Sequence, residues 1–298
     1  MKTSLQARVT GGTGRKELSM SDSPTRPVTV PSLRTMKQQG RKIVALTAYD
    51  YPTAMLLDQA GVDILLVGDS LGMVVLGYSS TLPVTMDEMI HHTKAVVRGT
   101  KRALVIADMP YFSFHQGRDL TVANASRFLK EAGASAVKIE GGSAKRLRLI
   151  EALVEAEIPV MGHVGLTPQS IRRLGAFRVR GSDPAEAARI MEDALRVEKA
   201  GAFAVVLECL PLDLAAKITR KLKVPTIGIG AGPRCDGQIL VFHDLAGYPT
   251  GFLPKFVKRY ADLGTVIRDS AERFAAEVRS GAFPDEAHSY HRPAGKKR

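Results

Sequence analysis

The sequence has few cysteines, no tryptophan and no long apolar run. Cys209 and Cys235 are the only two cysteines among 298 residues, too few for a disulfide framework or a cysteine-based zinc site. We therefore expect a reducing compartment, where such residues serve in packing. No stretch of 18 apolar residues occurs, so we expect no membrane contact. The first residues lack the apolar segment of a secretory signal.

The net charge of +12 is unevenly distributed along the chain. Residues 1–42 carry nine Lys or Arg against two acids, and residues 284–298 carry four against two. Between them the two signs nearly balance, so most of the excess lies in Ser-, Gly- and Pro-rich ends that are typical of mobile tails. We expect no nucleic-acid partner, although a basic nucleic-acid-binding protein is the non-enzymatic alternative.

Eight short apolar runs are typical of strands that are buried on both faces, as in a parallel sheet. They lie at residues 42–50, 63–70, 102–110, 135–142, 158–165, 203–211, 224–232 and 237–244. Segments with helical spacing separate most of them, and several end in a glycine suited to a helix C-terminus. This alternation over ~240 residues predicts an α/β fold, the (β/α)8 TIM barrel. A doubly wound sheet is the alternative, but the first run is followed by "AYDYPTA", with no nucleotide-binding glycine turn.

Length and composition fit one large domain, with 45% hydrophobic residues available for its core. We expect a flexible N-terminal extension at 1–27, the catalytic barrel at 28–283 and a basic tail at 284–298. We also expect a cytoplasmic location. The alternative is a mitochondrial one, because Arg8, Arg15 and Arg26 lie among Ser and Thr, although acidic residues there weaken that interpretation.

Charged side chains stand at the ends of five successive predicted strands. They are Asp69, Asp108, Lys138, Glu140, His163 and Glu208. A single aspartate in this position often caps the next turn. A barrel, however, brings all the strand ends to one mouth, where active sites of this fold lie. The side-chain period of two also puts Lys138 and Glu140 on one face of their strand.

Three carboxylates that converge in a buried mouth require a cation. Asp69, Asp108 and Glu140 form an oxygen-only set, which favours Mg²⁺. His163 is expected to donate a hydrogen bond to substrate, with nitrogen ligation as the alternative. Such an ion can chelate a 2-oxo acid and stabilise its enolate. Glu208 lies apart from the other acids and suits the general base; its alternative is a salt-bridged structural residue.

Eight motifs in order, over residues 28 to 286, resemble those of the 3-methyl-2-oxobutanoate hydroxymethyltransferase (ketopantoate hydroxymethyltransferase) family. They read "LTAYDYPTA", "VGDSLGMVVLGYSSTLPVTMDEMIHHTKAV", "ADMPYFSF", "VKIEGG", "VMGHVGLTPQS", "LECLP", "IGIGAGPRCDGQILVFHDLAG" and "PKFVKRYADL". Departures are small: "YFSFHQG" stands where a Phe-Met-Ser-Tyr-like stretch is common, and Ala246 stands where Leu or Met is usual.

The resemblance implies transfer of a one-carbon unit from 5,10-methylenetetrahydrofolate to C3 of 3-methyl-2-oxobutanoate. The product is 2-dehydropantoate, a precursor in pantothenate synthesis. It also implies Mg²⁺ and a homo-oligomer, often a decamer. The resemblance assigns the metal to Asp69, Asp108 and Glu140, with Glu140 bound through water. It assigns the oxo acid to Asp69, Ser70, Asp108 and Lys138. Glu208 becomes the proton acceptor, and His163 lies where a donor could polarise the substrate.

The alternative enzyme is a Mg²⁺-dependent lyase or mutase of the phosphoenolpyruvate mutase and isocitrate lyase type. Such enzymes resemble this chain in barrel and in enolate chemistry, and fold analogy alone does not separate them. They usually carry a reactive cysteine in a Lys-Lys-Cys-Gly-His-like loop, and this chain has no such sequence. The pair His91 and His92 follows a helical pattern without an acidic cluster, so we expect neither residue to bind a metal.

Overall fold

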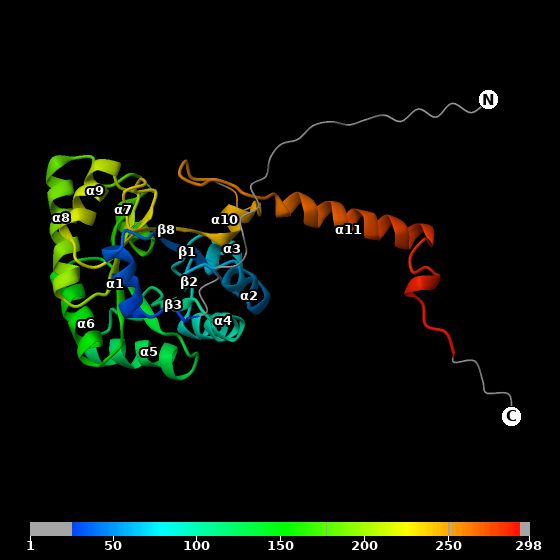
Figure 1. The fold of residues 1–298 in the computed structure, drawn as a ribbon, viewed down its shortest axis with the longest axis horizontal. Coiled ribbons are helices and arrows are strands. Elements are labelled where there is room, and N and C mark those ends of the chain that lie inside the picture. Colours follow the sequence, from blue (N-terminus) through cyan, green and yellow to red (C-terminus); the bar gives the residue numbers. More distant parts are fainter. Residues whose placement is uncertain (1–25, 177, 250, 252, 293–298) are drawn as a thin grey trace.

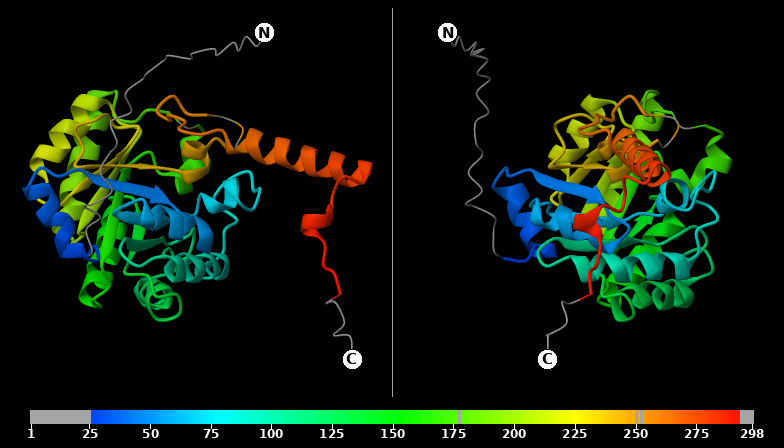
Figure 2. Two further views of the ribbon diagram at one scale, coloured as in Figure 1. Left: turned by 45° about the vertical axis from the view of Figure 1, so that its right-hand side comes forward. Right: turned by 90° about the vertical axis from the view of Figure 1, so that its right-hand side faces the viewer.

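Eight parallel strands close into a barrel in chain order, which confirms the predicted TIM-barrel fold (Figures 1 and 2). The structure, a computed structural model, describes residues 26–176, 178–249, 251 and 253–292. Each predicted run contains one observed strand. The strands are β1 (Ile43–Thr47), β2 (Ile64–Val67), β3 (Leu104–Asp108), β4 (Ala136–Glu140), β5 (Val160–Gly165), β6 (Ala204–Glu208), β7 (Thr226–Ile229) and β8 (Gly237–Leu240).

The strand period of two divides the apolar residues into two cores. On β4, Ala136 points into the barrel, while Val137 and Ile139 pack outward against the helices. On β2, Ile64 and Leu66 point inward in the same way. Every position of β2, β3 and β4 is buried, because both faces of these strands are covered, as is typical of parallel sheets.

Six helices match the helical segments expected from the sequence. They are α2 (Tyr51–Gln59), α4 (Met86–Gly99), α5 (Arg118–Lys130), α6 (Ala144–Glu155), α8 (Pro184–Lys199) and α9 (Leu212–Lys221). Further helices were not expected: α1 (Val30–Gln38), α3 (Leu71–Val74), α7 (Ile171–Leu174), α10 (Phe242–Ala246) and α11 (Leu263–Ser280). The predicted strand run 237–244 is longer than the observed strand β8, which ends at Leu240. Helix α10 begins at Phe242 and includes Asp244.

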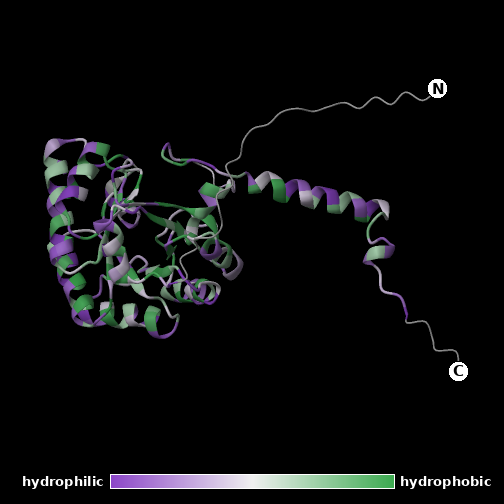
Figure 3. Ribbon diagram, viewed as in Figure 1, coloured by the Kyte–Doolittle hydropathy of each residue, from purple (hydrophilic) through white to green (hydrophobic). Residues whose placement is uncertain are grey.

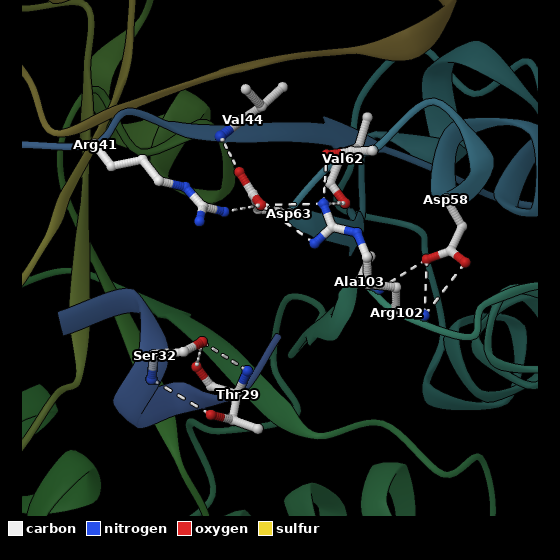
Figure 4. A network of polar contacts seen from close by, with 10 residues as sticks. Thr29, Ser32, Arg41, Val44, Asp58, Val62, Asp63, Arg102 and Ala103 are labelled. Carbon is white, nitrogen blue, oxygen red and sulfur yellow. Dashed lines mark hydrogen bonds and ion pairs between the residues drawn. The ribbon is translucent and has the colours of Figure 1, made fainter. Parts of the chain in front are cut away.

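Helix α1 and a polar network close the N-terminal end of the barrel (Figure 4). Leu33 and Met36 of α1 join the inner core. The Asp63 carboxylate, just before β2, accepts hydrogen bonds from Val44 N at 3.0 Å and from the Arg102 guanidinium at 3.1 Å. These contacts tie the starts of β1, β2 and β3 together.

Helix α11 stands away from the barrel, and none of its residues is buried (Figure 1). It follows β8 in the chain, where a TIM barrel places the helix that covers its last strand. The neighbouring outer surface of β1 and β8 is instead open. Val44 and Gln238, which face each other in the β1–β8 register, are both exposed.

The expected chain ends lie largely outside the described residues. Residues 1–25 of the predicted extension 1–27 and residues 293–298 of the predicted tail 284–298 are not described. The domain boundaries at 28 and 283 stay predictions. Val28 itself is buried, and its N–H donates to Arg102 O at 2.7 Å. Among the described helices, none is long and apolar enough to cross a bilayer.

Candidate active site

All seven site residues expected from the sequence line one cavity of about 120 Å³ at the C-terminal mouth of the barrel. They are Asp69, Ser70, Asp108, Lys138, Glu140, His163 and Glu208. Their placement follows from strand parity, because Asp108 lies two residues after the inward Ile106 and Glu208 two after the inward Val206. The polar ring therefore stands directly above the apolar layers that fill the barrel.

Asp69 and Asp108 lie side by side at the ends of β2 and β3. The Asp69 backbone N–H donates to Asp108 Oδ2 at 3.1 Å. A Cβ on Gly68 would lie 2.8 Å from Ser70 Oγ, so this glycine leaves room for the Ser70 hydroxyl beside the two acids.

Lys138 is the one lysine in this cavity, and it pairs with Asp108. Its Nζ lies 2.8 Å from Asp108 Oδ1, and both side chains are almost fully buried. Burial opposes the charged form of Lys138, but the surrounding carboxylates, Asp108 foremost, raise its pKa above the usual value. Lys138 is therefore a permanent cation in the site.

The remaining acids carry more negative charge than Lys138 can balance. Burial, and then the charge of Asp108, raise the pKa of Asp69 to about 7. Burial also raises the pKa of Glu140 well above its usual value. Three buried carboxylates face one ammonium group, an imbalance that a divalent cation would relieve.

The donor set fits Mg²⁺ better than a metal that needs a full protein cage. Among the described residues, no three His, Cys, Asp or Glu side chains are grouped closely enough to hold one ion. The three predicted ligands therefore do not form a cage. Mg²⁺ keeps several waters and takes one or two carboxylates, and the adjacent Asp69 and Asp108 suit that arrangement.

Glu140 is engaged elsewhere in the mouth. Its Oε2 accepts a hydrogen bond from Gln169 N at 3.2 Å, and its Oε1 lies 3.7 Å from His163 Nδ1. These contacts hold Glu140 beside the Asp69–Asp108 pair without pointing both oxygens at it. Contact with an ion through water is consistent with this position.

His163 links Lys138 to Glu208. Lys138 Nζ lies 3.3 Å from His163 Nδ1, and His163 Nε2 lies 3.2 Å from Glu208 Oε2. Burial, and then the charge of Lys138, lower the pKa of His163, so the ring is neutral near pH 7. An ammonium group can only donate, so Nδ1 accepts and the ring hydrogen lies on Nε2, facing Glu208.

Comparison with known proteins decides the family. The family described as "Ketopantoate hydroxymethyltransferase" matches residues 27–286. The 3-methyl-2-oxobutanoate hydroxymethyltransferase of Carboxydothermus hydrogenoformans is 56% identical over 88% of this chain and 95% of its own. The protein of the same name from Moorella thermoacetica is 58% identical over 88% and 97%.

The chain belongs to the ketopantoate hydroxymethyltransferase family. The family resemblance of the eight sequence motifs is thereby confirmed. Among solved structures, a phosphonopyruvate hydrolase in complex with oxalate and Mg²⁺ is 17% identical, with a TM-score of 0.56 over 87% of this chain and 92% of that one. A phosphoenolpyruvate phosphomutase from Streptomyces platensis subsp. rosaceus is 14% identical, with a TM-score of 0.58 over 85% and 88%. At such low identity these likenesses show the fold alone.

Two residues of this ketopantoate hydroxymethyltransferase family member were not singled out from the sequence. Gln169 Nε2 donates to Asp69 Oδ2 and to Met109 O, both at 2.9 Å. The Tyr49 hydroxyl lies 2.8 Å from Ser70 Oγ. Gln169 lies in the family motif "VMGHVGLTPQS" and Tyr49 in "LTAYDYPTA". Neither residue type by itself indicates a function in the site.

Both histidines of the pair lie on α4, as the helical pattern predicts. His91 is exposed, and His92 Nδ1 contacts Tyr49 O, just after β1, at 2.6 Å.

Proposed function

We propose that this chain transfers a one-carbon unit from 5,10-methylenetetrahydrofolate to C3 of 3-methyl-2-oxobutanoate, giving 2-dehydropantoate and tetrahydrofolate. Its curated relatives carry the name of this activity, and pantothenate synthesis is its pathway. The observation that supports the proposal is the arrangement of side chains at the barrel mouth. The neutral His163 lies beside Glu208, and Lys138 pairs with Asp108 in the same cavity.

Asp69 and Asp108 would hold Mg²⁺, with Glu140 reaching it through water. Mg²⁺, when bound, polarises the keto oxygen of the oxo acid and stabilises the negative charge that develops there. Lys138 and Ser70 lie in the same cavity and would bind and orient the acid. The small volume of about 120 Å³ suits a compact acid and excludes bulk water.

Glu208 is the base that takes the proton from C3. Its side chain is 16% exposed, and its Oε2 lies 3.2 Å from His163 Nε2. The carbanion equivalent at C3 then forms a bond to the methylene carbon of the folate, and the two C–N bonds of that carbon break. Water supplies the hydroxyl group, and the two folate nitrogens take up the proton removed from C3 and the other proton of the water, which gives tetrahydrofolate. Because His163 is neutral, it can steer Glu208 without competing for the proton.

Replacing the base tests this assignment. Glu208→Gln removes the proton acceptor and keeps shape, so we expect product formation to fall by ~10²–10⁴-fold with little change in oxo-acid affinity. Product is measured by mass spectrometry, and affinity by calorimetry with Mg²⁺. Glu151→Gln, on the exposed face of α6, is the matched control. Near-normal turnover in Glu208→Gln would show that another group is the base.

We also propose that the enzyme is a homo-oligomer, in which α11 packs on a second copy. Ile267, Phe274 and Val278 recur at helical spacing on one face of α11, yet each is about half exposed. Figure 3 shows apolar residues along the helix, and Figure 1 shows that the helix extends away from the barrel. The open surface of β1 and β8 around Val44 offers the matching apolar face.

Oligomeric state tests this packing, and a decamer is the assembly implied by the family. Phe274→Glu places a charge in the proposed contact, so we expect a smaller particle by light scattering. Ala276→Glu, on the opposite face of α11, should leave the wild-type assembly intact. Equal particle sizes for all three proteins would contradict a role for α11. We place the enzyme in the cytoplasm, as the sequence predicts; the relatives named above are bacterial.

A further inference from the structure

A second and larger cleft lies against the barrel mouth. Its volume is about 670 Å³, within the range of ~300–1,000 Å³ that is typical of small-molecule sites. Glu140 lines both this cleft and the small cavity. The loop after β5 forms the wall between them, because Gln169 lines the cleft and Pro168 lines the cavity. A molecule in the cleft would therefore reach the oxo acid from its side.

The cleft is strongly basic. Five arginines line it against three acidic residues. Two of these arginines are already committed to Glu186: Arg180 forms an ion pair with its carboxylate, and Arg189 lies 3.9 Å from it. Arg172 and Arg173 of α7 are exposed, and neither has an ion pair with any residue that the structure describes. Two adjacent guanidinium groups thus face the cleft without a counterion.

The opposite part of the cleft is aromatic. Tyr111, Phe114 and His115 line it, and their rings contact one another. Arg146 lies over the Phe114 ring at 4.3 Å and donates to Glu140 O and Phe114 O, which holds this wall in place. Flat heterocycles pack well against such rings. The cleft therefore combines a surface for an aromatic group with a site for carboxylates.

We infer that this cleft binds the folate co-substrate, with the carboxylates of its glutamyl tail on Arg172 and Arg173. The inference rests on the proposed function, which supplies a ligand with a flat heterocycle at one end and carboxylates at the other. Guanidinium groups bind carboxylates through paired charge-assisted hydrogen bonds. A tail of several glutamates carries more charge and should bind more tightly than a single one.

Direct binding to the full-length protein tests the inference without turnover. Calorimetry compares tetrahydrofolate that carries one glutamate with the form that carries five. In wild type we expect the pentaglutamate form to bind more tightly. Arg172→Gln/Arg173→Gln should weaken its binding roughly tenfold, which corresponds to about 1.4 kcal/mol, and should nearly abolish the difference between the two forms.

A matched control separates local binding from general charge. Arg34→Gln/Arg98→Gln removes two exposed arginines outside the cleft, and it should bind both folates as wild type does. Wild-type affinities in the Arg172/Arg173 variant would overturn the inference, and so would an equal loss in the control. Failure of the proposed function would appear separately, as a wild-type enzyme that binds folate but yields no 2-dehydropantoate.

Discussion

Gln169 offers a direct test of how the mouth is organised. Its side-chain amide donates to Asp69 Oδ2 and to Met109 O, both at 2.9 Å, and the side chain is buried. Gln169→Leu keeps the approximate volume and the backbone N–H that serves Glu140, but it removes both amide bonds. Asp69 Oδ2 then loses the hydrogen bond from Gln169.

The size of the effect follows from the two bonds. A hydrogen bond to a charged group contributes about 1.5–3 kcal/mol, and one to a neutral group about 0.5–1.5 kcal/mol. The first supports the ionised form of Asp69, so its loss should raise the pKa of Asp69 further. Supporting residues of this kind typically alter metal affinity by ~10–100-fold, and we expect Mg²⁺ affinity to fall in that range.

Calorimetric titration with Mg²⁺ at pH 8 measures this loss, and circular dichroism checks that the variant is folded. Gln59→Leu, an exposed glutamine at the end of α2, is the control and should bind Mg²⁺ as wild type does. Wild-type Mg²⁺ affinity in Gln169→Leu would refute the reasoning, because Asp69 would then need no support from Gln169.

Two further predictions concern the metal and the packing of the barrel. Because burial raises the pKa of Asp69 to about 7, the folded metal-free protein holds a proton that the unfolded chain releases above its ordinary pKa of 3.8, and stability falls as pH rises through this window. Mg²⁺ must displace that proton, so it should raise the melting temperature more at pH 8 than at pH 6; equal shifts would count against Asp69 as a ligand. A Cβ on Gly162 would lie 2.2 Å from Val197 Cγ1, so Gly162→Ala should cost about 1–3 kcal/mol of unfolding free energy by urea denaturation. Val197→Ala should relieve much of that cost in the double variant, and strictly additive losses would contradict the clash.

The fold could be predicted because its signals are local and repeated. Each strand is predominantly apolar, with Lys138 of β4 and His163 of β5 among the exceptions, and each expected helix shows the spacing of a face that packs on the sheet. The strand-end residues were predictable for the same reason, since barrel geometry alone brings Asp108 and Glu208 to one mouth. Their period of two above Ile106 and Val206 is visible in the sequence.

Other features depend on contacts between distant segments. Gln169 forms a hydrogen bond with Asp69, which lies 100 positions away in the chain. No sequence spacing predicts such a contact. Helix α11 has an ordinary amphipathic pattern, so the sequence could not indicate that it leaves the barrel surface. In the sequence, Arg172 and Arg173 resemble ordinary exposed charges. Only the structure shows that they line one cleft with Phe114.

The most direct test of the central claim is proton exchange at C3, followed by NMR. The enzyme is incubated in D₂O with 3-methyl-2-oxobutanoate and Mg²⁺, without folate. The account predicts loss of the C3 proton signal, stopped by a chelator and by Glu208→Gln. Retention of that signal with active, Mg²⁺-loaded wild-type enzyme would contradict removal of the proton by Glu208 as a step that needs only the metal and the oxo acid.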